Sequence, residues 1–295
     1  MTTARALIDE TLDLFYGPYR EKQNVLSGPV DTDDDVFSFN FELQGIGPGA
    51  MIGVDLEVCY VVAITGTGAQ VIRAQRGSAA VSHAAGALVT VNPRLSRHAV
   101  FRSLNEELYN LHGEGLYQMK TAELTYNSAI QGYGIPETVR FDEVYAVYHD
   151  TPGPGQSWPV IPMSEWRLLQ DAETDDFASG TGIVLYHAGV PGRQLRIQYR
   201  APFGQLADET SDPNNSTVGF PESANDLLVL GTVLRLGTFR EWPRNFFSHQ
   251  GDSRRAEEVP MGAQVTATRI SAQYRQMRLG SELMRLARRY PIEIR

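Results

Sequence analysis

Two different hydrophobic periods divide this chain, and together they restrict it to folds that contain both sheets and helices. In 37–43 every second residue is apolar, and the same alternation is present in 52–58. Successive side chains of a strand point to opposite faces, so apolar residues at every second position all lie on one face. Further strand-like runs lie at 61–64, 71–72 and 88–91. Turn residues separate these runs at intervals that are typical of a small sandwich or barrel.

Helical periods appear at the two ends of the chain and at internal segments. Residues 3–16 and 95–111 each carry apolar side chains on one face, with Ser96 as the expected N-cap of the second helix. Residues 223–240 predict a third helix, in which Ser223 and Asp226 resemble a capping box. Residues 263–289 predict a long fourth helix, and 242–261 are expected to link the two.

The remaining segments are read from turn and strand signals. Residues 19–35 are expected to be a connection that ends in the acidic run 31–35. Four carboxylates there suit calcium, but the run lacks the glycine turn and distal glutamate of a calcium loop, which favours a solvated turn. Strands are expected at 123–126, 140–148, 182–186 and 195–199, then a polar loop at 204–221. Pro291 should end the last helix, and 290–295 permit a short strand.

Charge is unevenly distributed along the 295 residues. Residues 235–295 hold twelve Arg and six acids, a balance of +6, whereas 1–234 hold 14 Lys+Arg and 29 acids, a balance of −15. Such asymmetry indicates surfaces that meet different partners. The acidic body is unsuited to clamping nucleic acid. It either lines a passage through which DNA slides or simply keeps the protein soluble.

Motifs that carry chemistry are missing from the sequence. The six histidines show no metal-ligand spacing, and there is no Gly-x-Ser-x-Gly elbow, phosphate-binding loop or dinucleotide fingerprint. The single cysteine, Cys59, lies in an apolar run and reads as a small buried hydrophobe rather than a nucleophile. We therefore expect a non-enzymatic protein without a cofactor or bound metal.

The predicted long C-terminal helix carries the most prominent group of charged residues in the sequence. Five residues of this helix follow one another at alternating spacings of four and three, and all but the serine are apolar: Ile270, Tyr274, Met277, Ser281 and Met284. Arginines accompany them on the same helix with a single acid, Glu282. The candidate interface residues are Arg269, Tyr274, Arg275, Met277, Arg278, Met284, Arg285 and Arg288. The arginines contact an acidic neighbouring subunit or DNA phosphate, or are merely solvated; a neighbouring copy is favoured over DNA.

The most distinctive string is 71–80, followed by His83, Gly86 and the sequence Val-Asn-Pro-Arg at 91–94. Its candidate residues are Arg73, Arg76, Gly77, His83 and Gly86. Gly77 and Gly86 suit tight turns, and the two arginines either bridge subunits or are solvated. This string resembles a β-hairpin pattern of virion structural proteins in tailed phages of actinobacterial hosts. With the N-terminal helix, the β insert and the segment 224–291, the layout resembles a phage head-to-tail adaptor, also called a connector.

The resemblance implies a structural subunit of the virion neck, assembled in the host cytoplasm as a homo-oligomeric ring of twelve copies. Its implied partners are the portal protein, the next neck or tail protein, the capsid vertex, and genomic DNA that passes without sequence-specific binding. We expect an α+β fold, with a helical ring-forming body (1–35, 95–112 and 222–295), a β-hairpin region (36–94) and a β-sandwich-like domain (113–221). Adaptors of this class are smaller and largely helical, so the β-rich middle departs from the pattern.

Two alternatives remain open from the sequence. A tail or baseplate component would share the hairpin string but form rings of three or six copies. A carbohydrate-binding β-sandwich would use aromatic side chains such as Trp158, Trp166 and Tyr199 to stack on sugars.

Overall fold

The computed structural model describes residues 2–16, 21–135, 144–150, 158–169, 172–173, 175–177, 179–186, 189–248 and 263–289, with the backbone alone at 16, 238–248 and 263–268. Within these ranges the protein is α+β, with four α-helices and antiparallel sheets. The chain divides into two compact units, Met1–Asn110 with Gly204–Arg295, and Leu111–Phe203.

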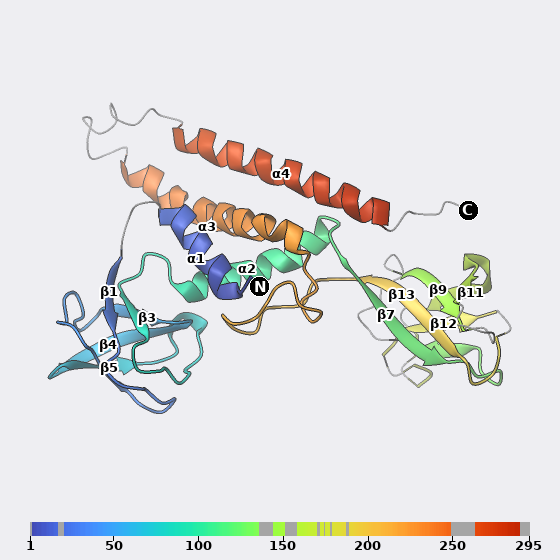
Figure 1. Cartoon of the computed structure of the whole chain (residues 1–295), viewed down its shortest axis with the longest axis horizontal. Helices are drawn as coiled ribbons and strands as arrows, with labels where there is room; N and C mark the ends of the chain where they lie inside the picture. The colour runs from blue at the N-terminus through green and yellow to red at the C-terminus, as the bar shows by residue number, and fades with distance from the viewer. Residues whose placement is uncertain are drawn as a thin grey trace. The chain divides into compact units, whose positions relative to one another are not determined.

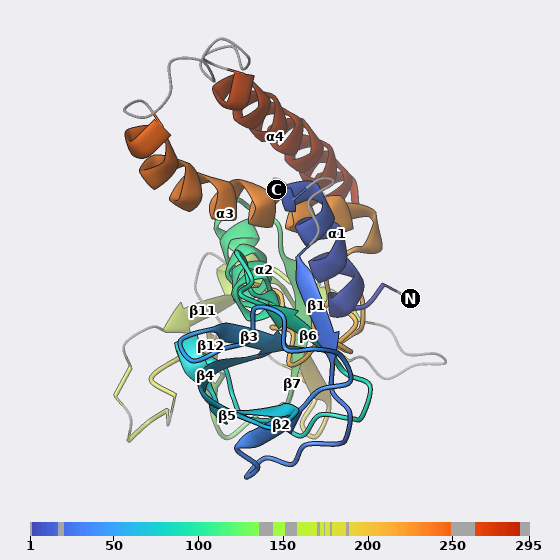
Figure 2. The same cartoon turned by 90° about the vertical axis from the view of Figure 1, so that its left-hand side faces the viewer.

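A curled antiparallel sheet forms one part of the first unit, with strand order β1-β6-β3-β4-β5-β2. Its strands are β1 (Lys22–Val25), β2 (Val36–Ser38), β3 (Met51–Val54), β4 (Glu57–Thr65), β5 (Gly68–Ile72) and β6 (Leu88–Val91). The two edges meet, because Leu26 beyond β1 bridges Phe39 beyond β2. Figure 2 shows the strands wrapping around a common interior. That interior is apolar and includes Phe37, Ile52, Val61 and Val89.

Three sequence predictions for this sheet were wrong. The run 37–43 forms a strand only at its start, as β2, while Phe39 makes an isolated bridge and Phe41 is exposed. The run 52–58 is two strands, because the chain reverses at Asp55 and Leu56 to form the β3–β4 hairpin. The inward positions change there from even to odd numbers, and Glu57 takes a core position, so the apolar pattern hides the reversal. The connection 19–35 contains β1, which pairs with β6; its sequence, Lys-Gln-Asn-Val, carries almost no apolar signal.

Four helices complete the first unit (Figure 1): α1 (Ala4–Tyr16), α2 (Arg97–Gly113), α3 (Asn225–Ser248) and α4 (Ala263–Arg289). The Ser96 hydroxyl accepts the Ala99 amide at 3.2 Å, which confirms Ser96 as the N-cap of α2. The helix α3 extends beyond 240 and passes Pro243, whose missing amide removes one hydrogen bond without ending the helix. The linker predicted for 242–261 is therefore wrong for 242–248, and the rest of it lies outside the described residues.

The second unit contains two antiparallel sheets that share one apolar core. The first has the order β10 (Val160–Ile161), β9 (Val144–His149), β13 (Gln194–Ala201) and β7 (Gln118–Thr125). The second has the order β11 (Trp166–Leu169), β12 (Gly182–Leu185) and β8 (Gly132–Gly134). The start of the strand predicted at 140–148 and the strand predicted at 290–295 lie outside the described residues.

No helix in the described ranges has both the length and the apolar character that a bilayer crossing requires.

Candidate functional sites: a buried ionic network and an exposed helix face

The hairpin string found in the sequence is not a β-hairpin in the structure. It forms a turn and a loop between β5 and β6, and these two strands pair with other strands of the sheet, not with each other. Gly77 and Gly86 have φ values of +80° and +85°, which confirms the prediction that they occupy turns that favour glycine. Ala74 and Arg76 also have positive φ, at +54° and +56°. Such backbone is unfavourable for residues with a Cβ, so the surrounding contacts must hold it in place.

The Glu57 carboxylate supplies those contacts from inside the sheet. Its side chain is fully buried. Its donors are the Arg73 guanidinium at 2.6 Å, the His83 Nε2 at 2.8 Å, the Ala74 and Val81 amides at 3.2 and 3.3 Å, and the Cys59 thiol at 3.4 Å. A charged group leaves water at a large cost unless it is paired and hydrogen-bonded. The donors of the turn therefore compensate the buried charge of Glu57, and the Glu57 carboxylate in return holds the backbone of the turn in place.

Arg73 closes the other side of the buried charge. Its guanidinium lies 5.3 Å from the centre of the Phe37 ring and donates to the carbonyls of Asp31, Asp34 and Val81. The acidic run 31–35 is thus a turn that Arg73 stabilises through hydrogen bonds to its backbone carbonyls. The Arg73 side chain is only 9 % exposed, which corrects both sequence interpretations of this residue, as a subunit bridge or as a solvated arginine.

His83 continues the network toward the helices. Its Nδ1 lies 3.1 Å from the Asp55 carboxylate, and Asp55 accepts a hydrogen bond of 3.2 Å from Arg5 of α1. Arg5 also binds Glu209 at 3.0 Å, and Glu209 accepts Arg97 of α2 at 2.7 Å. Arg97 pairs in turn with Asp9 of α1. Alternating charges therefore connect the sheet, α1, α2 and the 207–211 loop within the first unit.

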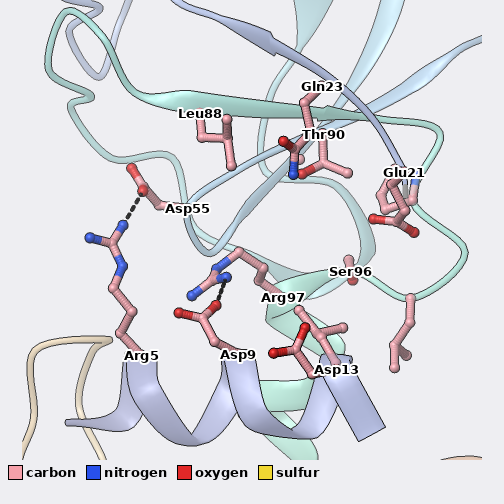
Figure 3. Close-up of a pocket in the computed structure, with 14 residues that line it drawn as sticks. Arg5, Asp9, Asp13, Glu21, Gln23, Asp55, Leu88, Thr90, Ser96 and Arg97 are labelled. Atoms are coloured by element: carbon pink, nitrogen blue, oxygen red, sulfur yellow. Dashed lines mark hydrogen bonds and ion pairs between the residues drawn. The ribbon is translucent and has the colours of Figure 1, made fainter. Parts of the chain in front are cut away.

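A cleft of about 550 Å³ lies where these elements meet. Figure 3 shows Arg5 directed at Asp55 and Arg97 directed at Asp9 across its floor, with Gln23 and Thr90 of the sheet on the opposite wall. Its two arginines are already paired with carboxylates of the same chain. The lining also contains the carboxylates of Asp13 and Glu21, so acids outnumber arginines in the cleft.

The network shifts the pKa of its members in opposite directions. Burial opposes a charge on His83, but hydrogen bonds to Asp55 and Glu57 outweigh that effect and raise its pKa to about 8. Burial also opposes a charge on Glu57, yet the hydrogen bonds from His83 and Arg73 hold its pKa well below the usual range. The hydrogen bond from His83 lowers the pKa of Asp55. The cluster is thus most stable fully charged.

This arrangement is unsuited to catalysis. Both ring nitrogens of His83 are engaged by carboxylates, so the ring lacks the free nitrogen that a general base needs. Burial raises the pKa of the Cys59 thiol, which disfavours the nucleophilic thiolate. Within the described ranges, no three His, Cys, Asp or Glu side chains are grouped so that they could hold a metal ion.

Arg76 lies apart from the buried network. It is exposed and lines a second cleft of about 520 Å³ together with Gly77, residues of α2 such as Arg102 and Tyr109, and Arg235 of α3. Arg102 and Arg235 both contact Glu106. The two arginines of the hairpin string therefore have different positions, one structural and one at the surface.

Polar contacts and a buried leucine attach the inner face of α4 to the first unit. Arg275 is buried and pairs with Glu107 of α2. Arg278 binds Asp226 of α3 at 2.6 Å, and the Ser223 hydroxyl donates to Glu282 at 3.1 Å. Ser223 and Asp226 hold α4 in this way and do not form the predicted capping box. Among the apolar residues of this face, Leu279 is buried.

The outer face of α4 carries the apolar residues that the sequence spacing singled out. Ile270, Tyr274, Met277 and Met284, which we call the α4 stripe, are between 46 % and 70 % exposed. Arg269, Arg285 and Arg288 are exposed beside it, and Arg285 also pairs with Glu282 at 2.8 Å. Of the eight candidate interface residues, Arg275 thus faces the interior of this chain and Arg278 is half-buried against α3.

Two of the three aromatic residues considered for sugar stacking are buried, and the third has one face covered. Trp166 and Tyr199 belong to the core of the second unit. The Arg196 guanidinium lies 3.9 Å from the centre of the Trp158 ring and covers one of its faces.

Sequence reasoning missed the residues that pair with the candidates. Glu57, Asp55, Glu107 and Glu209 were not singled out, and none belongs to a recognisable motif. The one available signal was Glu57, a charged residue directly beside the apolar run Val58 to Ile64. No family model matches this chain, and no curated protein sequence matches it significantly.

Proposed function

We propose that this protein is a non-enzymatic structural subunit of a tailed-phage virion, one copy of a ring that joins the portal to the neck or tail. The observation that carries the proposal is the α4 stripe: a heptad-spaced apolar face, exposed along a helix whose other face is already attached to the chain. Exposed apolar surface of this kind marks a protein–protein contact.

The architecture supports the same role. The helices of the first unit would form the body of the ring, and the second unit, Leu111–Phe203, would be an added β-sandwich-type domain, absent from smaller adaptors. The buried network makes the hairpin string a structural device, in agreement with a protein that supplies surfaces rather than chemistry. The partners are other copies of the chain, the portal protein, the next neck or tail protein and the capsid vertex, with genomic DNA passing through the ring in the virion.

Two findings rank this proposal above the carbohydrate-binding alternative. Trp166 and Tyr199 are core residues, and Trp158 is covered by Arg196. Stacking on a sugar requires an open aromatic face; Trp166 and Tyr199 are buried, and one face of Trp158 is taken by Arg196.

The test is the assembly state of the purified full-length chain. Sedimentation and electron microscopy should show closed rings, either at high protein concentration or on addition of the portal protein encoded nearest to its gene. Rings of about twelve copies are expected from the resemblance; rings of three or six would favour a tail or baseplate component. A chain that stays monomeric under both conditions and does not bind portal would overturn the proposal.

A further inference from the structure

A second exposed apolar surface lies on the curled sheet, far along the chain from α4. Val36, Tyr60, Val62 and Ile72, which we call the strand patch, are between 38 % and 53 % exposed. Tyr60 of β4 lies directly opposite Ile72 of β5, and Val36 of β2 lies opposite Gln70 on the other side of β5. Side chains of directly paired residues stand on the same face of a sheet, so the patch is continuous over three strands.

An acidic border lies along the strand patch. The run 31–35 is exposed at every position and immediately precedes Val36. Asp35 is fixed at the edge of the patch, because its carbonyl accepts the Val71 amide at 2.8 Å and its carboxylate accepts the Gln70 amide group at 3.1 Å. Arg73 holds the turn from beneath through the carbonyls of Asp31 and Asp34. The carboxylates of this run therefore lie at a fixed place beside the apolar residues.

The α4 stripe has the complementary character. It is apolar along its centre, and Arg269, Arg285 and Arg288 lie exposed beside it. Complementary charges around an apolar centre steer association and fix the register of two surfaces.

We infer that the strand patch of one copy receives the α4 stripe of a second copy. This inference rests on the proposed ring and names the two surfaces that would form its repeating contact. Packing of the stripe against the stripe of another copy would bring arginines together and leave both strand patches uncovered. Packing of stripe on patch covers both surfaces and leaves each copy with one of each, which is the head-to-tail contact from which a ring closes.

Cysteine trapping tests the contact in the full-length chain. Cys59 is the sole native cysteine and is buried, so background cross-linking should be low. Tyr274→Cys and Ile72→Cys are prepared as separate proteins, assembled together and oxidised. The inference predicts a disulfide-linked dimer in the mixture and none in either variant alone, whereas the double variant should give a ladder of multimers. Tyr109→Cys, exposed on α2, replaces Ile72→Cys as the control and should give no cross-link with Tyr274→Cys.

A second measurement does not depend on disulfide geometry. Ile72→Asp should raise the protein concentration needed for half-maximal assembly by at least about tenfold, because the charge would enter an apolar contact without a partner. Tyr109→Asp should leave that concentration within about twofold. Both substitutions are at exposed positions, and unchanged thermal unfolding would verify that the variants fold.

The outcomes separate this inference from the proposed function. Rings that form normally with Ile72→Asp, and that show no 72–274 cross-link, overturn the inference and leave the ring proposal intact. A cross-link between two Tyr274→Cys chains also overturns it, because the stripe then packs on itself. A wild-type chain that never assembles, with or without portal protein, overturns both.

Discussion

At the residue scale, Glu57 shows how a charge can organise a turn from inside a core. The strained backbone at Ala74 and Arg76 is stabilised because the neighbouring amides and the Arg73 guanidinium converge on one carboxylate. Breaking one partner of a buried ion pair leaves the other charge uncompensated, which costs more than the pair itself contributes.

Arg73→Ala should therefore destabilise the protein by roughly 3 kcal/mol or more, as measured by urea unfolding. Arg76→Ala is the matched control, since Arg76 is exposed three residues away in the same turn, and its effect should stay within about 0.5 kcal/mol. Equal losses for the two variants would contradict the structural division between these arginines.

The charged state of His83 should make stability fall in mildly alkaline solution. Its pKa rises from 6.5 to about 8 on folding, so protonated His83 contributes stability that is fully present below pH 6.5 and is lost as pH rises through 8. The shift corresponds to a loss of about 2 kcal/mol.

Unfolding free energies measured between about pH 6 and pH 9 check this expectation, and His83→Gln should flatten the slope within that window. A wild-type profile parallel to that of the variant would show that other groups cause the pH dependence. At acidic pH the stability depends on Glu57 instead. Because folding lowers the pKa of Glu57, its ionised carboxylate contributes stability that is fully present above pH 4.5 and is lost on acidification below that value.

At the element scale, the attachment of α4 depends on a glycine of α3. A Cβ added at Gly231 would collide with the Glu107 carboxylate, which pairs with Arg275. Gly231→Ala should therefore displace the buried ion pair and destabilise the protein by about 2 kcal/mol or more.

Two glycines provide controls for this substitution. A Cβ at Gly237 of α3 or at Gly280 of α4 meets nothing within 4 Å. Alanine at either position should stabilise by up to about 1 kcal/mol, because alanine has the higher helix propensity. Denaturant unfolding of the three variants separates the packing effect from the propensity effect; destabilisation by all three would contradict the special role of Gly231.

Periodicity predicted the elements whose apolar faces follow one uninterrupted pattern. The helices α1, α2 and α4 and the strand-like runs 61–64 and 88–91 belong to this group. It failed where a polar residue carries the structural role. Glu57 occupies a core position at the β3–β4 reversal, and Arg275 pairs with Glu107, which lies 168 positions away in the sequence. Pairings between distant charges depend on the tertiary fold, so no local pattern could supply them.

At the scale of the whole molecule, much of the positive charge in the C-terminal part of the sequence lies on α4. The α4 helix carries six arginines and one glutamate, whereas residues 1–234 have a balance of −15. Arg275 and Arg278 use part of this positive charge within the chain. Arginines exposed beside the α4 stripe remain at the surface, where they can contribute to contacts between copies.

Assembly should therefore weaken as salt increases. Raising NaCl from about 0.1 M to about 1 M shortens the Debye length from about 10 Å to about 3 Å and screens exposed charge pairs. We expect the concentration for half-maximal assembly, measured by light scattering, to rise several-fold over this range. Assembly that is unchanged or strengthened by NaCl would indicate a contact held by apolar burial alone.

The apolar part of the contact is tested by a change that leaves the isolated chain intact. Met277 and Met284 are 70 % and 66 % exposed, so Met277→Asp with Met284→Asp should alter the unfolding free energy by no more than about 1 kcal/mol. The same pair should abolish ring formation, because two charges would enter an apolar interface without partners. Gln276→Asp, exposed on the same helix, adds one charge outside the stripe and should assemble normally. Rings formed by the double variant would show that α4 reaches no neighbouring copy, and that its exposed methionines serve another purpose.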